Sequence, residues 1–490
     1  MADEGDKNAN WRFGATEEIQ LATLARVAWV EQQQREPLAP LLDMSKENEV
    51  ESDAATNVLD VLAETSHGDL LKRFLDRLAE VFAREKEPIN FVSCTAMVEQ
   101  EDGATIFVSR NKKLVKHDDK FSRNLAVCLE KLSRGSFYVR KVDHNLIIVS
   151  DVGNHEQESQ LWELLLVFYE KRIEYNIRQF LHGMRSSAQG RSLSVAKEGD
   201  TVGDFAKLQS DCQQFRAGNK SLAGSIVKSA NDLARAVDIK ACLGRSIRQG
   251  RIESTLELLR FLGRLRLAYD TILDAAKRFA SFSQVTIIFV ETPIVSNPRA
   301  SLEQAMGVID ACYKTGGMKL PSWITERVPH SKFKKFEVAL GQPLHVHAEV
   351  QMLFFLLHAD RGDLQPLPYL GVSKKTCLLC GYFLENFSRF GARRNHGKIY
   401  PNWTLPRQAR LQKEYPTCMN AAIRSLMVST ASLALDRDQS KLNMVKESDA
   451  APSTSSGMNP TTDSAVDHLR RQYHERFARE RNAKWLENLG

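Results

Sequence analysis

One histidine, one glutamate and two cysteines in the second half of the chain have the residue types and the spacing of a metal site. His347 lies in the stretch HVHAEV, and Glu349 follows two residues later. Cys377 and Cys380 form a Cys-x-x-Cys pair that begins 30 residues after His347. Zinc prefers imidazole and thiolate ligands, and two cysteines three residues apart on a helix can reach one ion. The spacing therefore predicts a Zn²⁺ site with His347, Cys377 and Cys380 as ligands.

The Cys-x-x-Cys pair carries most of this signal. A histidine followed two residues later by an acid is expected about 1.5 times by chance in this composition, and His67, His117 and His358 begin three further copies. A Cys-x-x-Cys pair is expected only about 0.1 times, and the chain contains one. A decayed site without metal and a coincidence of spacing are the alternatives to a zinc site.

The predicted elements around these residues suit a catalytic centre. HAEVQMLFFLL and CLLCGYFLENF predict two buried helices with the candidate ligands at their starts, and LPYLGVS predicts a strand before the second helix. Facing helix N-termini favour thiolates, because the helix dipoles stabilise negative charge. One histidine and two cysteines leave zinc's fourth position open, so Glu349 could transfer protons beside it. In the alternative, a structural zinc, His345 closes that position.

His-Ala-Glu followed by Cys-x-x-Cys resembles the zinc-dependent nucleoside and nucleic-acid deaminase superfamily, which has the cytidine-deaminase-like α/β fold. More narrowly, HAEVQMLFFL with GVSKKTCLLCGYF resembles a deaminase-like family abundant in filamentous fungi, over residues 341–405. The resemblance implies that the zinc site hydrolyses an exocyclic amine to a carbonyl and releases ammonia, with Glu349 moving the protons. Thr376 stands where the superfamily usually has proline, which argues against a close relation to free-nucleoside enzymes.

Several further residues are candidates for contact with the substrate. The resemblance matches Asn111 to a substrate-contacting asparagine of the superfamily. The segment 388–403 groups cations with aromatic residues, which could track phosphates and stack on a base; the alternative is a solvated loop leading into an edge strand. The candidate substrate residues are Asn111, Ser373, Lys374, Arg393, Arg394, Tyr400 and Trp403.

The fold class predicted is α/β, a cytidine-deaminase-like three-layer domain with a large, mainly helical insertion or accompanying helical domain. Helical periodicity occurs over residues 16–35, in the segment that starts at Gly68, and over much of 160–282. One hairpin is predicted just before Lys112 and another over 137–150. The predicted organisation is a helical region at 1–66, a helix and hairpin at 67–115, a mainly helical insert or domain at 116–330, the zinc deaminase-like domain at 331–440, a disordered linker at 441–466 and a charged helical tail at 467–490.

The start of the deaminase fold has two candidate locations. The resemblance implies a helix and a hairpin before the first zinc helix. The segment 68–112 supplies both, but more than 200 residues then separate it from His347. A helix ending near Phe282 and a strand at 284–291 are the alternative, and we favour the first.

Composition limits the class of protein. The chain has 490 residues, 43% of them hydrophobic, which is enough for sizeable cores. Acids and bases are mixed along the chain, with a net charge of +6, so acidic partners are permitted without being required. Eight sparse cysteines and the absence of a signal peptide or an apolar run of membrane length predict an intracellular protein, cytoplasmic or nuclear.

The function predicted from the sequence is zinc-dependent hydrolytic deamination of an amino-purine or amino-pyrimidine base. We favour nucleic acid over a free nucleoside as substrate, because the Cys-x-x-Cys helix is followed by basic and aromatic residues. The alternative is a non-catalytic interaction protein with a structural zinc or a pseudo-deaminase domain. The helical regions and the C-terminal tail could then bind a protein partner.

Overall fold

The computed structural model describes most of the chain between residues 8 and 435. The described segments are 8–32, 67–84, 92–100, 103–112, 115–135, 138–142, 145–149, 155–187, 201–291, 300–315, 319–326, 331–358, 365–387, 389–393, 395–412 and 415–435. The predicted linker at 441–466, the predicted tail at 467–490 and Arg394 lie outside the described residues.

A five-stranded sheet is the centre of the molecule. Its strand order is β6-β3-β2-β8-β9. The strands are β2 (Ser93–Glu99), β3 (Ala104–Arg110), β6 (Val285–Phe289), β8 (Tyr369–Val372) and β9 (Gly391–Ala392). Strand β2 runs antiparallel to β3 and β8, whereas β6 runs parallel to β3 and β9 parallel to β8. Segments almost 300 residues apart in sequence thus share one sheet.

The middle strands are buried on both faces. Side chains alternate along a strand, so Cys94, Ala96 and Val98 of β2 enter one hydrophobic core, whereas Met97 enters a second. The side chains of strand β3 alternate in the same way: Phe107 lies in the first core and Ile106 in the second. The sheet is therefore the middle of three layers, with helices on each side.

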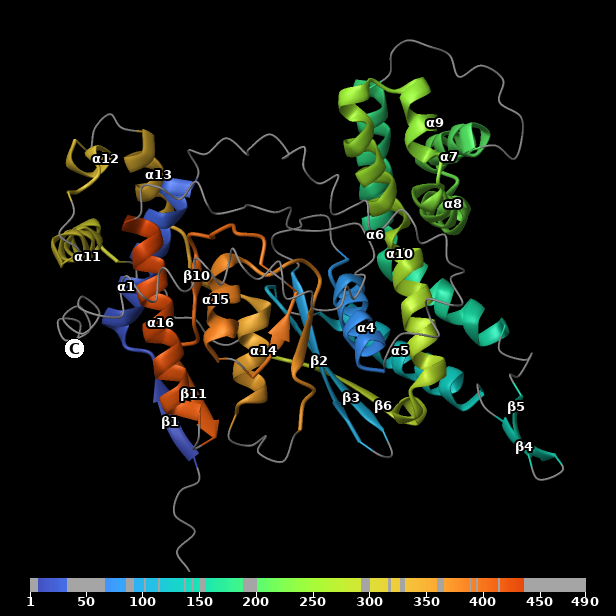
Figure 1. The fold of residues 1–490 in the computed structure, drawn as a ribbon, viewed down its shortest axis with the longest axis horizontal. Coiled ribbons are helices and arrows are strands. Elements are labelled where there is room, and N and C mark those ends of the chain that lie inside the picture. The colour runs from blue at the N-terminus through green and yellow to red at the C-terminus, as the bar shows by residue number, and fades with distance from the viewer. Residues whose placement is uncertain are drawn as a thin grey trace, which may run out of the picture.

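The first face is covered by the helices that carry the candidate ligands. Helices α14 (Ala348–Leu356) and α15 (Leu378–Phe387) are next to the sheet, and α1 (Ala15–Gln32) and α16 (Tyr415–Leu435) lie outside them (Figure 1). Almost every residue of α14 is buried, which explains why its sequence is apolar on all sides. Helices α11 (Leu302–Thr315), α12 (Ser322–Thr325) and α13 (Ser331–Leu340) extend this layer.

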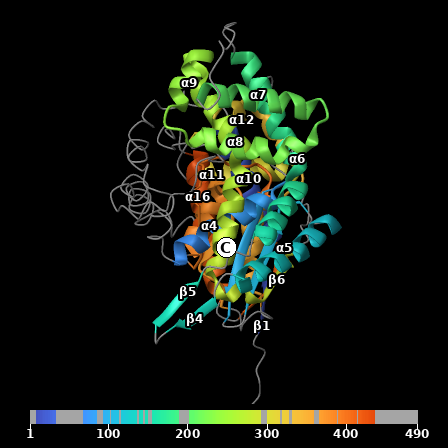
Figure 2. The same ribbon diagram turned by 90° about the vertical axis from the view of Figure 1, so that its right-hand side faces the viewer.

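The second face is covered by a larger helical layer. Helices α4 (His67–Phe82) and α5 (Lys116–Gly135) cover the sheet, and α10 (Ile252–Arg278) packs against both of them and against α6 (His155–Ser187). Figure 2 looks onto this side of the molecule. Helices α7 (Thr201–Arg216), α8 (Ala223–Arg235) and α9 (Ile239–Ser246) pack at the far end of α6 and α10. Short 3-10 turns occur at Lys220–Leu222 and Gln249–Arg251 in this region, and at Ala280–Ser283 between α10 and β6.

Three two-stranded pairings complete the described fold. Strand β1 (Asn8–Arg12) pairs with β11 (Gln408–Gln412), β4 (Tyr138–Val142) with β5 (Asn145–Val149), and β7 (His345–Val346) with β10 (Trp403–Thr404). The hairpins predicted from the sequence are confirmed as β2–β3 and β4–β5. In the part of the chain that the structure describes, no helix has the length and apolar character needed to cross a membrane.

The two candidate starts of the predicted fold lie in the same sheet. Helix α4 and the β2–β3 hairpin pack together, and β2 is the direct neighbour of β8. Strand β6 joins the sheet on the other side of β3. The structure is therefore a mixed helix and sheet fold of the α/β kind, in which the early hairpin and the later strand both contribute.

Candidate metal centre

His347 lies at the junction between the short strand β7 and helix α14. It is the N-cap residue of α14, with an extended backbone at φ −70° and ψ 156°. The backbone N–H of Ala348 donates to Asn111 Oδ1 at 2.7 Å, and the Gln351 side chain donates to the Val346 carbonyl at 2.7 Å. Ser109 Oγ donates to the Ala348 carbonyl at 2.7 Å. These bonds fix the start of α14, and with it the position of the imidazole.

The two cysteines lie at the start of helix α15. Cys377 directly precedes α15, and its Sγ accepts the backbone N–H of Cys380 at 3.3 Å. This is the contact that a helix-capping side chain makes with a free amide of the first turn. The N–H of Leu378 donates to the Lys398 carbonyl at 3.0 Å. Both thiols are buried, with Cys377 3% and Cys380 0% exposed.

The three predicted ligands come together although 30 residues separate the histidine from the cysteines. Both sulfurs lie 3.5 Å from His347 Nδ1, and all three donor atoms lie within 4.8 Å of one another. Tetrahedral zinc with Zn–S bonds of about 2.3 Å and Zn–N bonds of about 2.0 Å separates sulfur from nitrogen by about 3.5 Å. The donor types and the distances therefore fit zinc. His347, Cys377 and Cys380 could hold the ion.

Glu349 is buried beside the triad without being part of it. Its side chain is on the first turn of α14, 2% exposed, and Oε2 lies 3.7 Å from Cys380 Sγ. Burial raises the pKa of this carboxyl above its ordinary value, although the neighbouring His347 opposes the shift. A carboxyl with a raised pKa next to a hydrolytic centre is suited to accept and return a proton.

The charges of the three donor groups depend on one another. Burial raises the pKa of Cys377, but hydrogen bonds from Cys380 and the nearby His347 outweigh it and bring the pKa well below its usual range. Burial lowers the pKa of His347, and the Cys377 thiolate more than reverses this. Burial and the neighbouring thiolate raise the pKa of Cys380. One thiol thus gives up its proton readily, as ligation requires.

Two aromatic residues of the 388–403 segment reach the centre. The Tyr400 ring lies edge-on to His347, with 5.7 Å between the ring centroids, and it also contacts the buried His396. Trp403 is fully buried, and its indole N–H donates to Cys380 Sγ at 3.2 Å. Tyr400 therefore lies partly exposed at the edge of the site, and Trp403 is buried against Cys380.

The remaining predicted substrate residues lie in different surroundings. Asn111 supports α14 as described above, and Lys374 is partly exposed just before the cysteine pair. Ser373 is buried, and its Oγ accepts the N–H of Ser93, which extends the pairing of β8 with β2. His345 is exposed on β7 and lies outside the metal-ligand group of the described residues.

Arg393 belongs to a buried ion-pair cluster on the second face of the sheet. Its Nε donates to Asp76 at 2.8 Å and its Nη1 to Glu80 at 3.0 Å, both on α4. Glu80 also accepts from Arg77 at 2.6 Å and from Arg264 of α10 at 2.7 Å. Burial raises the pKa of Glu80, but the three guanidinium groups outweigh it and lower the pKa to about 2.

Gln32 belongs to the surroundings of the site, although no sequence pattern indicates it. This buried residue at the end of α1 donates from Nε2 to the Gly397 carbonyl at 2.6 Å and accepts the Ile399 N–H at 2.9 Å. Gly397 has φ 76°, in the left-handed region that favours glycine. The amide thus holds the loop that carries His396 and Tyr400. The only local signal in the sequence is that glycine.

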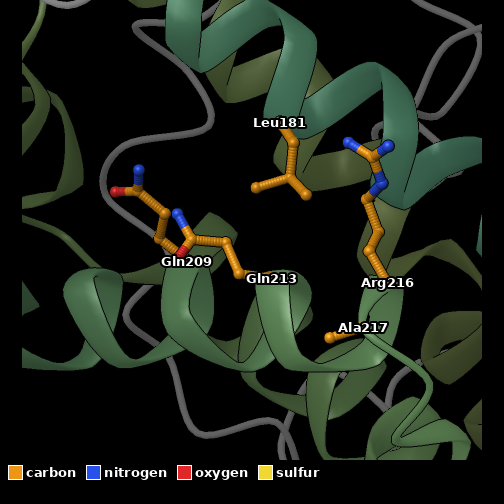
Figure 3. A pocket seen from close by; sticks show the side chains of 5 residues that line it. All are labelled: Leu181, Gln209, Gln213, Arg216 and Ala217. Carbon is orange, nitrogen blue, oxygen red and sulfur yellow. The ribbon is translucent and has the colours of Figure 1, made fainter.

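A concave site in the helical layer has no comparable chemistry. A cavity of about 290 Å³ lies between α6 and α7, and its lining is Leu181, Gln209, Gln213, Arg216 and Ala217 (Figure 3). Leu181 points into it from α6, and the two glutamines and the arginine extend toward it from α7. This lining contains no acid, histidine or cysteine.

Comparison with known proteins identifies the same part of the chain. Residues 346–407 match the family described as "OTT_1508_deam:-like deaminase". This match confirms the deaminase resemblance inferred from the motifs, while fungal origin stays a prediction. No curated protein and no solved structure matches the chain. The matched segment contains the three metal-ligand candidates and Glu349.

Proposed function

Because residues 346–407 are a domain of a deaminase family, we propose that this chain is a zinc-dependent hydrolytic deaminase of an amino-purine or amino-pyrimidine base. The observation that carries the proposal is the buried group of His347, Cys377 and Cys380, with the non-ligand Glu349 beside it. Three protein ligands and a neighbouring carboxyl are the arrangement of hydrolytic rather than closed structural zinc.

The roles of the residues follow from their chemistry. Zinc held by His347, Cys377 and Cys380 supplies Lewis acidity and a water of lowered pKa. Glu349 would accept a proton from the attacking water and deliver it to the departing amine. Water adds to the carbon that carries the exocyclic amine, and the C–N bond then breaks. One proton of the water leaves with the amine as ammonia and the other ends on the ring nitrogen beside the new carbonyl. Tyr400, edge-on to His347, is proposed to contact the base.

The finer fold assignment is also a proposal. Helix α4 and the β2–β3 hairpin precede the first zinc helix, as the cytidine-deaminase-like fold requires, and both zinc helices cover one face of the sheet. In this assignment, α5 to α10 form a helical insertion between the hairpin and the zinc helices. Lys112, next to Asn111, and Lys374, before the cysteines, are exposed or partly exposed, which supports nucleic acid as the first substrate class to test.

Substitution of Glu349 by glutamine tests the proposed activity. We expect Glu349→Gln to keep zinc and stability while ammonia release falls by about 10²–10⁴-fold, because the amide cannot take a proton. Zinc is measured by elemental analysis. Ammonia is measured with single-stranded DNA, RNA, cytidine and adenosine. The matched control is Glu337→Gln, an exposed position on α13 that should leave both readouts unchanged.

Three results would contradict the proposal. Loss of zinc in Glu349→Gln would make the glutamate a ligand or a structural support. Full activity of that variant would remove its role in proton transfer. A zinc-loaded parent chain that deaminates none of these substrates would favour the alternative, a non-catalytic interaction protein whose zinc is structural.

A further inference from the structure

Trp403 is placed against the metal centre by the pairing of two short strands. Strand β10 pairs with β7 in parallel, with Trp403 opposite His345, two residues before the ligand His347. The indole is 0% exposed and meets Phe383 of α15 nearly edge-on, with ring centroids 6.3 Å apart. Phe383 is one turn beyond Cys380 on the same helix. The ring is therefore fixed to both elements that carry ligands.

The indole N–H is directed at a ligand atom. Trp403 Nε1 donates to Cys380 Sγ at 3.2 Å in a fully buried environment. An indole nitrogen can only donate, and a buried donor without a partner is costly, so the sulfur has a defined role as its acceptor. Other tryptophans of the same core bond oxygen instead: Trp11 donates to Asn420, and Trp323 donates to Glu31.

We propose that Trp403 is a positioning residue of the metal centre, whose N–H stabilises and orients the Cys380 thiolate for zinc. The N–H dipole lowers the cost of negative charge on a sulfur whose burial disfavours it. It also fixes the direction of the sulfur lone pairs. Outer groups of this kind typically alter metal affinity by about 10–100-fold. This inference depends on the zinc site of the proposed function, but not on the reaction or its substrate.

The placement also bears on the role suggested by the sequence. A tryptophan in a basic and aromatic segment could stack on a base, but that requires an accessible ring face. At 0% exposure, Trp403 has neither face open to solvent. Its contribution to the site is instead the single N–H that reaches Cys380.

Removal of the N–H with retention of the aromatic ring tests the proposal. We expect Trp403→Phe in the full-length chain to bind zinc about 10–100-fold more weakly in competition with a chromogenic chelator. In the cobalt-substituted protein, the thiolate-to-metal charge-transfer band should shift. The matched control is Trp323→Phe, which removes a partly buried indole bond to Glu31 from a tryptophan of the same hydrophobic core and should change neither readout.

A second replacement covers the case in which phenylalanine disturbs folding. Benzothienylalanine at position 403 keeps the bicyclic shape and replaces the N–H by sulfur, so it should weaken zinc binding in the same way. Unchanged zinc affinity with this residue would overturn the proposal, and so would a parent chain that binds no zinc. The two proposals can also be separated. If the parent chain binds zinc but deaminates none of the substrates, and the position 403 variants bind zinc more weakly than the parent, this inference is supported and only the proposed function is overturned.

Discussion

Two buried polar clusters lie on opposite faces of the same sheet, and they differ in how their charges are balanced. On the second face, Glu80 meets three guanidinium groups, and Asp76 accepts bonds from Arg393, Tyr369 and the Val372 N–H. On the first face, an imidazole and two thiols point at one another, and their donor atoms lie within 4.8 Å. The ion-pair cluster pairs carboxylates with guanidinium groups, whereas the metal centre brings three metal-ligand groups together.

The difference separates a structural cluster from a metal site. A buried charge is tolerated when opposite charges and hydrogen bonds surround it, and the ion-pair cluster meets this condition from α4, α10 and the segment after β9. Three converging ligand groups are instead best stabilised by a cation between them. The ion-pair cluster therefore joins α4 and α10 to the sheet edge at β9, whereas the metal centre is suited to chemistry.

The largest effect is expected from breaking the metal centre. We predict that Cys377→Ser lowers zinc from about one ion per chain to none, because a hydroxyl is a poor substitute for a thiolate ligand. The serine hydroxyl can still accept the Cys380 N–H, as helix-capping side chains do, so the start of α15 should stay formed. Elemental analysis of tag-free protein measures the zinc content, and hydrogen exchange of α15 checks that the helix stays formed.

The control for this variant is a buried cysteine on the other side of the sheet. Cys212 of α7 is 0% exposed and lies in the second hydrophobic core, so Cys212→Ser should keep its zinc even if stability falls. A Cys377→Ser chain that keeps a full zinc complement would show that the ion, if present, is bound elsewhere.

The residues of the two clusters could be predicted from sequence to different extents. His347, Cys377 and Cys380 were found because ligand chemistry needs particular residue types at short spacings. Helices such as α4 and α10 were found from their apolar periodicity. The ion pairs were not found, because Arg264 and Glu80 are 184 residues apart and mixed charges are common throughout the chain. The side-chain contact of Asn111 with α14 spans 237 residues and has no local signature beyond the resemblance.

Breaking the ion-pair cluster should cost stability without affecting zinc. Glu80→Gln leaves Arg77, Arg264 and Arg393 without their shared carboxylate, which typically costs about 3–5 kcal/mol when one partner of a buried pair is lost. We expect a lower urea midpoint and an unchanged zinc content. Loss of zinc together with stability would show that the two faces of the sheet are not independent.

An exposed carboxylate provides the comparison for Glu80. Asp119 pairs with Arg123 one turn along α5, and its side chain is 55% exposed. Because solvent screens such a pair, Asp119→Asn should change stability by no more than about 0.5 kcal/mol. A similar loss in both variants would assign the Glu80 effect to net charge rather than to the buried cluster.

A smaller effect than that of Glu80→Gln is expected where a distant helix supports the edge of the metal centre. Gln32→Ala removes two buried hydrogen bonds to Gly397 and Ile399, and leaving such groups unpaired costs about 1–3 kcal/mol. The loss should be local, because the amide holds a loop rather than a core element. We therefore expect faster hydrogen exchange at residues 396–400, unchanged zinc content, and a raised KM if Tyr400 contacts the base. Gln412→Ala, which removes a partly buried bond to the His358 carbonyl, should leave that loop unaffected. Unchanged exchange at 396–400 in Gln32→Ala would mean that the bonds of Leu378 and Thr376 to this loop hold it without help from α1.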